Sequence, residues 1–371
     1  MWNYYQPVHV IWGEGKVKDL GQVMKEAGYQ RGFMIADRFL AESGMTDKLI
    51  GYSDNRIIGV STDVEPNPSI QNVDDAAAKA KGVDADCIIA FGGGSSMDCA
   101  KSVAASLAGG QTGEELLSGV AINKALPVIA IPTTAGTGSE VTAGAVLSDK
   151  KRGIKSAIFS PLLFPAIALV DPELTYTVPP KVTASTGLDV LAHCFDALSS
   201  VKANPVTDAL AMRAAGLAVR NLERAFDDGQ DHEARAGMSQ ASTIAGLAFS
   251  QTGTTGSHAC SYMLTSHYHV PHGEACAFTM DSWFVINAKF RPEMNEFAKE
   301  LGFADAEAVA AWLNRLKKKF GMRMTLQDIG ITEEDIPALA ENDMKSGNMA
   351  NDIAKVDLED VSEIFRSKSQ L

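Results

Sequence analysis

The sequence predicts an α/β domain on a parallel sheet over residues 1–180, followed by an all-α domain over residues 181–371. The first half alternates short β-rich runs with helical patterns, which is typical of parallel strands joined by crossover helices. Prolines gather from residue 172 to residue 180, and beyond them Ala, Met and Leu recur at helical spacing while β-rich runs nearly vanish. The chain of 371 residues is also long enough to bury the cores of two domains.

The expected elements follow from these patterns in chain order. Strands are expected at Gly32–Ala36, Arg56–Val60, Asp86–Phe91, Val128–Ile131 and Ile167–Val170. Helices are expected between them at Val17–Ala27, Ser69–Lys81 and Ser95–Leu107. In the second half helices are expected at Thr207–Phe226, Glu233–Ala248, Ala306–Phe320 and Glu333–Met344.

Composition excludes several classes of partner. The net charge of −13 argues against non-specific binding to nucleic acid or to anionic membranes, because such binding depends on clustered Lys and Arg. No apolar run approaches the length of a membrane span. The five cysteines are odd in number, lack CxxC spacing and follow no secretory signal, so we expect reduced thiols in the cytoplasm. Cys194, Cys260 and Cys276 lie near the candidate ligands below, and we interpret them as small core residues.

Asp189 and His193 are four residues apart, so a helix would place both side chains on one face, as a metal requires of two ligands. Four of the seven histidines crowd into fifteen residues, and we expect His258 and His272 to reach back to that face. One carboxylate and three imidazoles suit a borderline divalent cation such as iron(II) or zinc. An isolated Asp-x-x-x-His is more often a helix-surface pair, and the motif alone leaves that interpretation open.

Two polar loops follow neighbouring strand candidates. Gly92-Gly93-Gly94-Ser95 comes directly after a buried strand pattern and opens a helix, whose free N–H groups and dipole attract a pyrophosphate. The second loop, Pro132–Glu140, concentrates hydroxyls and glycines suited to phosphate, ribose and amide contacts. Asp37 ends the first strand candidate, where it would bond an adenosine ribose and favour NAD over NADP. A plain tight turn and a simple helix cap are the alternatives.

Taken together, these motifs resemble the iron-containing (group III) alcohol dehydrogenases. The resemblance rests on Gly92-Gly93-Gly94-Ser95…Asp98…Lys101, Pro132-Thr133-Thr134-x-Gly136-Thr137-Gly138-Ser139-Glu140, Asp189-x-x-x-His193, and His258…Pro271-His272-Gly273. It runs over nearly the whole chain in the expected order and includes Gly13-x-Gly15, Pro66-Asn67-Pro68 and Asp171-Pro172-Glu173-Leu174.

The resemblance implies a Rossmann-like N-terminal domain, a helical C-terminal domain and a divalent metal, usually iron, in the cleft between them. It implies the metal ligands Asp189, His193, His258 and His272. It implies NAD(H) contacts by Asp37, Asn67, Gly93, Gly94, Ser95, Asp98, Thr133, Thr134, Thr137, Ser139 and Lys155. Dimers or larger homo-oligomers are usual in the family, so we expect a homo-oligomer.

The sequence also departs from the family pattern. Tyr262 stands where a further histidine, thought to serve substrate or proton traffic, is common. His267 lies five residues later and is our candidate proton relay, provided that its loop folds inward. Asp196 replaces a usual glutamate, and Cys276 replaces the asparagine of the commoner His-Gly-x-Ala-Asn run. Near the C-terminus the run Gly347-Asn348-Met349-Ala350 lacks the usual arginine.

The predicted activity is NAD(H)- and metal-dependent interconversion of a short aldehyde and its alcohol, with the metal acting as Lewis acid. Hydroxyls and glycines in Ser250–Ser257 suit the oxygens of a phosphonate, sulfonate or carboxylate, with Ser250, Thr254 and Ser257 as candidate contacts. The motifs Ser257–Tyr262 and His272–Cys276 together also resemble family branches that reduce phosphonoacetaldehyde, and sulfoacetaldehyde has a similarly shaped anion. We therefore predict a short anionic aldehyde as substrate.

Other functions stay open on sequence alone. A general short-chain alkanol or diol dehydrogenase needs no anionic pocket. A dehydroquinate-synthase-like lyase, which uses NAD transiently and zinc, would need several basic residues near the metal, and Lys155 and Lys202 are the nearest in sequence. A metal-free reductase of the maleylacetate type would not need the intact ligand set. A nucleotide-binding regulatory protein has no positive feature in the sequence.

Overall fold

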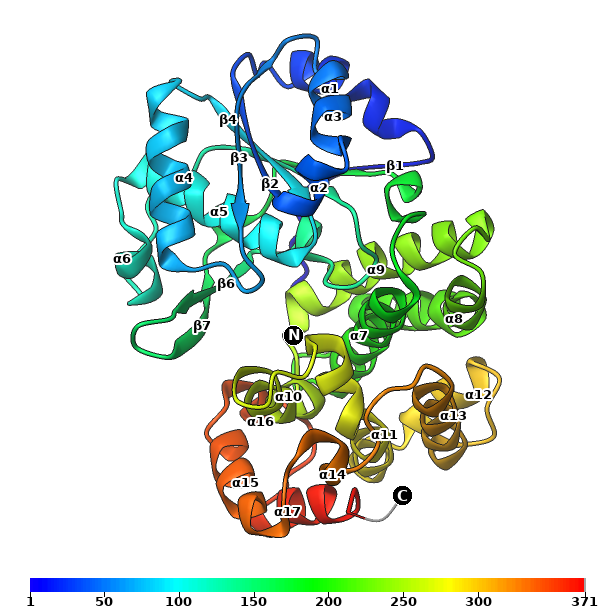
Figure 1. Ribbon diagram of the computed structural model, residues 1–371. Helices are drawn as coiled ribbons and strands as arrows, with labels where there is room; N and C mark the ends of the chain where they lie inside the picture. Colours follow the sequence, from blue (N-terminus) through cyan, green and yellow to red (C-terminus); the bar gives the residue numbers. More distant parts are fainter. Residues whose placement is uncertain (370–371) are drawn as a thin grey trace. The chain divides into compact units, whose positions relative to one another are not determined.

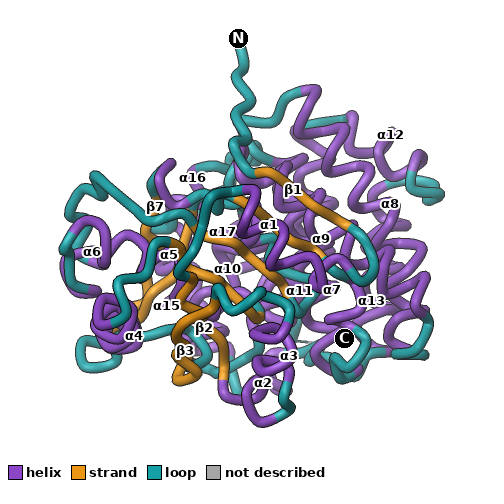
Figure 2. The backbone as a smooth tube through the Cα atoms, turned by 90° about the horizontal axis from the view of Figure 1, so that it is seen from above, coloured by secondary structure: helices purple, strands orange, loops and turns teal. Residues whose placement is uncertain are grey.

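The computed structural model describes residues 1–369, apart from the side chain of residue 154, and the chain forms two compact units. The first unit is Gln6–Tyr176, and the second runs from Thr177 onward and includes Met1–Tyr5. All strands of the described chain lie in the first unit, and helices build the second (Figures 1 and 2). The fold therefore matches the predicted parallel α/β part followed by an all-helical part.

The first unit is organised around a six-stranded parallel sheet. Its strand order is β1 (His9–Trp12), β8 (Ile167–Val170), β5 (Val128–Pro132), β4 (Cys87–Gly92), β2 (Gly32–Asp37) and β3 (Ile57–Val64). Every neighbouring pair is parallel. The five predicted strands are all present. The sequence pattern missed the short edge strand β1 and the antiparallel hairpin of β6 (Gly144–Asp149) and β7 (Ile154–Phe159).

Alternate residues of the central strands face opposite layers. Phe33 and Ile88 belong to the core under α4 (Ile70–Gly82) and α5 (Gly94–Gly109), whereas Met34 belongs to the core on the other face. Because helices cover both faces, these strands are apolar at consecutive positions. The remaining helical segments of this unit are η1 (Lys16–Asp19), α1 (Leu20–Glu26), α2 (Arg38–Glu42), α3 (Met45–Gly51), α6 (Gly113–Leu117), η2 (Ser139–Val141), η3 (Pro161–Leu163) and η4 (Pro172–Thr175).

The carboxyl ends of β2, β4 and β5 lie side by side. These three strands end at Asp37, Gly92 and Pro132, and β4 pairs with both of the others. The Thr133 N–H donates to the Gly92 carbonyl over 3.0 Å, which ties the loop after β5 to the loop after β4. In open parallel sheets the crevice at such strand ends is the usual place for a ligand.

The second unit is organised around α7 (Pro180–Ser199). It packs against α8 (Pro205–Asp227), α9 (His232–Thr252), α10 (Gly256–Ser266) and α11 (His272–Phe290). Every residue of α7 from Gly187 to Ser199 is buried, as expected of a helix enclosed by others. The remaining helices are α12 (Glu293–Glu300), α13 (Ala306–Lys319), α14 (Leu326–Ile329), η5 (Glu333–Asp335), α15 (Ile336–Met344), α16 (Gly347–Ala350) and α17 (Leu358–Arg366). Within residues 1–369 we find no helix with the length and apolar character needed to cross a membrane.

Candidate metal centre and dinucleotide site

Three imidazoles converge on one carboxylate oxygen in the helical unit. The Nε2 atoms of His193, His258 and His272 lie 4.0, 3.7 and 3.9 Å from Asp189 Oδ1. Two donors bound to one tetrahedral cation through bonds of about 2.1 Å are roughly 3.4 Å apart. The three nitrogen–oxygen distances here are slightly longer than that value. The distances are too long for hydrogen bonds and suit donors arranged around a common ion.

The buried atoms at the centre of this cluster lack hydrogen bonds. Among residues 1–369, Asp189 Oδ1 and His258 Nε2 are both inaccessible to solvent and have no hydrogen-bond partner. Unpaired polar atoms at this depth cost about 1–3 kcal/mol each, and a bound cation would satisfy both. The donor types and their burial therefore fit iron(II) or zinc. His272 is the open side of the cluster, with 38% of its side chain exposed.

Local sequence explains how the ligands are positioned. Asp189 and His193 lie one turn apart on α7, as the four-residue spacing predicts. His272 is the first residue of α11, directly after Pro271. A side chain at Gly273 would put its Cβ 1.9 Å from the Ser185 carbonyl oxygen, so only glycine lets the start of α11 approach α7 this closely.

Asp196 holds the third histidine in place. Its carboxylate accepts hydrogen bonds from His258 Nδ1 at 2.7 Å, from the Thr255 N–H at 2.7 Å and from Ser257 Oγ at 2.6 Å. Burial alone would raise the pKa of Asp196, but His258 and these donors hold it below its usual range. With Nδ1 as the donor, the second ring nitrogen, Nε2, is the metal-facing acceptor, which is the carboxylate–histidine–metal arrangement.

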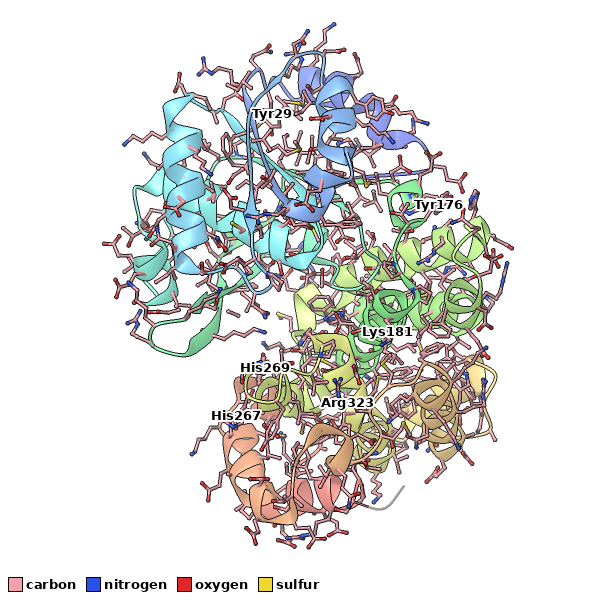
Figure 3. All side chains as sticks on the ribbon, in the orientation of Figure 1. Tyr29, Tyr176, Lys181, His267, His269 and Arg323 are labelled. Carbon is pink, nitrogen blue, oxygen red and sulfur yellow. The ribbon has the colours of Figure 1, made fainter. Side chains whose placement is uncertain are left out.

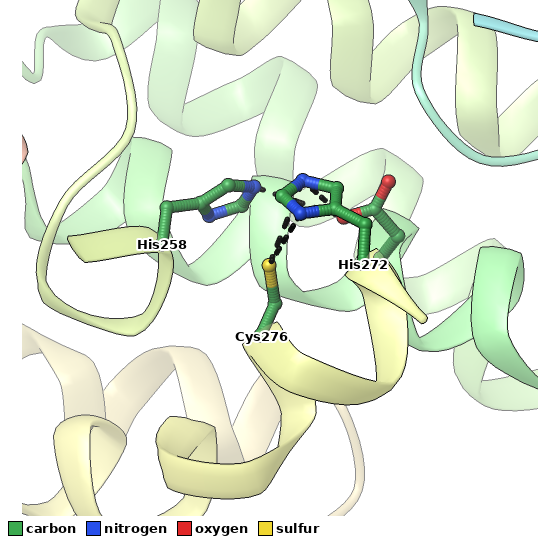
Figure 4. Close-up of side chains that lie close together, drawn as sticks. His258, His272 and Cys276 are labelled. Carbon is green, nitrogen blue, oxygen red and sulfur yellow. Dashed lines mark hydrogen bonds and ion pairs between the residues drawn. The ribbon is translucent and has the colours of Figure 1, made fainter. Parts of the chain in front are cut away.

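Cys276 also points into the cluster. It lies one turn after His272 on α11, and its Sγ is 3.8 Å from His272 Nε2 (Figure 4). Donor atoms of Asp189, His258, His272 and Cys276 all lie within 4.8 Å of one another. Burial raises the pKa of this thiol.

The glycine loop in the first unit leaves the start of a long helix exposed to a ligand. Gly93 is the N-cap of α5 and supplies no side-chain hydrogen bond to it, so first-turn N–H groups keep their capacity to bind an anion. The loop after β5 lies against it: a Cβ added to Gly93 would be 3.3 Å from Thr134 Oγ1, and one added to Gly94 would be 2.8 Å from Thr137 Cγ2.

A buried polar network holds these two loops together. Asp98 accepts from Ser139 Oγ at 2.8 Å and from the Val146 N–H at 2.9 Å. Lys101 Nζ donates to Ser139 Oγ at 2.7 Å and to the Gly144 carbonyl at 2.9 Å. Burial lowers the pKa of Lys101 to about 8 and raises that of Asp98. The network fixes the loop after β5 from behind.

Residues 7–172 match the family described as "Iron-containing alcohol dehydrogenase", and residues 183–369 match "Fe-containing alcohol dehydrogenase family, C-terminal". The chain belongs to the iron-containing alcohol dehydrogenases. Its relatives include 1,3-propanediol dehydrogenase of Klebsiella pneumoniae, 34% identical, with 99% of this chain and 98% of the relative covered. Alcohol dehydrogenase 4 of Schizosaccharomyces pombe is 32% identical over 98% of this chain and 88% of its own.

The solved structures agree with this assignment. The crystal structure of sulfoacetaldehyde reductase from Bifidobacterium kashiwanohense in complex with NAD+ superposes with a TM-score of 0.96. That protein is 39% identical, and the match covers 100% of this chain and 99% of the other. The predicted family, the fold and the oxidoreductase class are thus confirmed.

In this iron-containing alcohol dehydrogenase the relay candidate His267 does not join the metal cluster. It is the exposed C-cap of α10 (Figure 3), and its ring lies edge-on to the ring of Tyr268. The relay role required the loop of His267 to fold inward, and in the structure this histidine is exposed while the Val270 N–H ties the loop to the Leu264 carbonyl. The Asn348 side-chain amide donates a hydrogen bond to the Tyr262 hydroxyl over 2.8 Å, and partial burial raises the pKa of that hydroxyl.

The expected substrate hydroxyls are largely engaged elsewhere. Ser257 is buried and donates to Asp196, which corrects its assignment as a substrate contact. Ser250 Oγ donates to the Leu247 carbonyl within its own helix. Thr254 is half-buried in the turn before α10. The hydroxyls of Ser250 and Ser257 are thus engaged within the helical unit, which weakens the physical reason given for an anionic pocket.

The other predicted cofactor residues gather around the glycine loop. Asp37 caps α2 by accepting from the Leu40 N–H at 2.9 Å, and it lies 3.5 Å from where a Cβ of Gly92 would be. The Asn67 N–H donates to Ser95 Oγ at 3.2 Å. Lys155 on β7 is close enough for its charge to oppose the rise in the pKa of Asp98. Ser139 and Asp98 support the loops from the interior, so Ser139 is not placed as a direct cofactor ligand.

Two residues of the site escaped the sequence interpretation. Asp196 was noted only as a substitution, although it follows Asp189 by seven positions and His193 by three, the spacing of one helix face. Cys276 was interpreted as a core residue, although its spacing of four from His272 repeats that of Asp189 and His193.

Proposed function

We propose that the protein catalyses the NAD(H)-dependent interconversion of a short aldehyde and its alcohol. Residues 1–180 would bind the dinucleotide, and residues 181–371 would hold the divalent cation and the substrate. The observation that carries the proposal is the convergence of three imidazole Nε2 atoms on Asp189 Oδ1. In this family such a cluster belongs to an oxidoreductase.

The metal-site residues divide into ligands and a positioning residue. Asp189, His193, His258 and His272 would hold iron(II) or zinc, and Asp196 would keep His258 in the tautomer that binds it. When both are bound, the cation supplies Lewis-acid polarisation of the carbonyl and the reduced nicotinamide supplies hydride. Burial of the inner ligands keeps water from them, and the partly exposed His272 marks the side open to substrate.

The dinucleotide residues act through backbone and hydroxyl groups. The first-turn N–H groups of α5 would bind the pyrophosphate, because they are free of a side-chain cap. Thr134 and Thr137, packed on the glycines, would contact the nicotinamide side. Asp37 would bond the adenosine ribose and disfavour a 2′-phosphate, which selects NAD over NADP. The NAD+ complex of the sulfoacetaldehyde reductase relative supports this assignment.

For the substrate we propose a short anionic aldehyde, with sulfoacetaldehyde first and phosphonoacetaldehyde second. The support is the similarity to sulfoacetaldehyde reductase over the full chain. The second candidate is an uncharged alkanol or diol, favoured by the similarity to 1,3-propanediol dehydrogenase and by the engaged hydroxyls of Ser250 and Ser257.

Steady-state NADH oxidation with sulfoacetaldehyde, phosphonoacetaldehyde, butanal and lactaldehyde tests both candidates. We expect the highest kcat/KM with sulfoacetaldehyde. Butanal turnover equal to or better than this would overturn the anionic substrate and leave the general dehydrogenase. Absence of net NADH consumption with every aldehyde would instead favour the lyase alternative, which returns its NAD unchanged.

We further propose a cytoplasmic homo-oligomer, a dimer or larger. All five cysteines are unpaired and buried, which supports a reducing compartment. Light scattering coupled to gel filtration measures the assembly, and a monomeric mass would contradict it.

A further inference from the structure

Two helices each direct a pair of side chains, one turn apart, at the same point. Asp189 and His193 come from α7, and His272 and Cys276 come from α11. Figure 4 shows the sulfur of Cys276 pointing toward the imidazoles of His258 and His272. The thiol is fully buried, so its direction is set by packing.

Cys276 differs from Cys260, a second buried thiol of the helical unit. Cys260 on α10 belongs to the hydrophobic core cluster around Phe278 and Trp283. A thiol that only filled space would be expected among apolar side chains. Cys276 instead faces donor atoms, with Sγ 3.8 Å from His272 Nε2.

The atoms beside this thiol supply an independent indication of a ligand. Asp189 Oδ1 and His258 Nε2 are buried without hydrogen bonds among the described residues. A carboxylate oxygen of Asp189 and a ring nitrogen of His258 lie within 4.8 Å of Cys276 Sγ. Bonds of about 2.1 Å to nitrogen and 2.3 Å to sulfur put neighbouring donors roughly 3.1–3.6 Å apart around a cation with four to six ligands. The 3.8 Å between Sγ and His272 Nε2 is slightly wider than that range.

We propose that Cys276 is a metal ligand in this protein, in addition to the Asp and His donors. The inference rests on the proposed metal-dependent function. On binding, the metal–sulfur bond replaces the S–H bond of the thiol, and the proton leaves to solvent. A soft thiolate among borderline donors shifts the preference of the site from iron(II) toward zinc.

The full-length protein loaded with cobalt(II) tests the inference without reference to activity. A cobalt–thiolate bond gives an intense charge-transfer absorption in the near ultraviolet that imidazole and carboxylate ligands do not give. We expect this band in the wild type, its loss in Cys276→Ser and its retention in Cys260→Ser, the matched control. Circular dichroism of each variant confirms folding.

Competition with a chelator gives a second readout. We expect Cys276→Ser to bind zinc at least about tenfold more weakly, with a smaller change for manganese(II), which has little preference for sulfur. A wild type that binds one cobalt per chain without the band would overturn the role of Cys276 alone, as would a band that persists in Cys276→Ser. A wild type that binds no cobalt at all would instead overturn the proposed function.

Discussion

Asp196 gives the sharpest test of how the metal centre is positioned. In Asp196→Asn, an amide oxygen in the place of Oδ2 keeps the bonds from Thr255 N–H and His258 Nδ1. The amide NH2 then faces Ser257 Oγ, which can rotate and accept. Hydrogen-bonding geometry therefore survives in the variant, and only the negative charge is lost.

The loss of charge sets the expected magnitude. A hydrogen bond to a charged group contributes about 1.5–3 kcal/mol, against about 0.5–1.5 kcal/mol for a neutral pair. The bond to His258 thus weakens by about 1–1.5 kcal/mol, which lowers metal affinity about tenfold. In Asp196→Ala the imidazole has no acceptor to fix its tautomer, and we expect a loss of about a hundredfold, the upper range for such supporting residues.

Chelator competition for zinc, with urea unfolding in parallel, measures both effects. Asp352 provides the control, because it is a buried carboxylate that accepts from the Gly256 and Ala354 N–H groups and has no hydrogen bond to a candidate metal ligand among the described residues. We expect Asp352→Asn to leave zinc affinity unchanged. Wild-type affinity in Asp196→Asn would refute the reasoning, and an equal loss in Asp352→Asn would show that helix packing, not the carboxylate–imidazole pair, is responsible.

Three further outcomes follow from the structure. His272→Ala should lose its metal and activity yet keep its helical circular dichroism, whereas His267→Ala should keep its metal; full activity in the first variant contradicts the ligand assignment. Gly94→Ala puts a Cβ 2.8 Å from Thr137 Cγ2 and should raise the Kd of NADH at least about tenfold in fluorescence titration, with metal content unchanged; an unaltered Kd argues against the glycine loop as the cofactor site. Burial raises the pKa of Asp343 from 3.8 to about 7, so the folded state binds more protons than the unfolded state between these values, and stability falls as pH rises. From pH 5 to pH 8 the free energy of unfolding should fall by about 2.5 kcal/mol because of this one group. Urea unfolding of Asp343→Asn should show a smaller fall over the same range, and the same pH profile in the variant and the wild type would contradict the assignment.

The sheet was predictable because its strands are buried on both faces. Runs such as Asp86–Phe91 carry apolar residues at consecutive positions, and glycine-rich loops mark where they end. The edge strand β1 was missed because its four residues are all partly or fully exposed, which leaves no clear pattern. The hairpin of β6 and β7 was missed because neither GAVLSD nor IKSAIF alternates polar and apolar residues, so neither shows the pattern of a half-buried strand.

The candidate metal ligands were predictable because the residue types are rare and their spacing is helical. The four-residue repeat of Asp189 and His193 became specific only beside the histidines clustered at residues 258–272. What surrounds them depends on tertiary packing that no local pattern encodes. The engagement of Ser257 by Asp196, and the outward position of His267, follow from how α10 packs on α7. A serine within a polar run, such as Ser257, is expected at the surface unless its partner carboxylate, here Asp196, is known.

The transfer of deuterium from NADH deuterated at the transferred position of nicotinamide C4 tests the central claim most directly. The labelled NADH is incubated anaerobically with the iron- or zinc-loaded enzyme and a short aldehyde, and it should deliver deuterium to C1 of the product alcohol. Prior chelation should abolish the transfer, and added metal should restore it. Metal-dependent hydride transfer would be contradicted if the label were still transferred after the metal had been removed. It would also be contradicted if the metal-loaded enzyme neither reduced nor labelled the aldehyde.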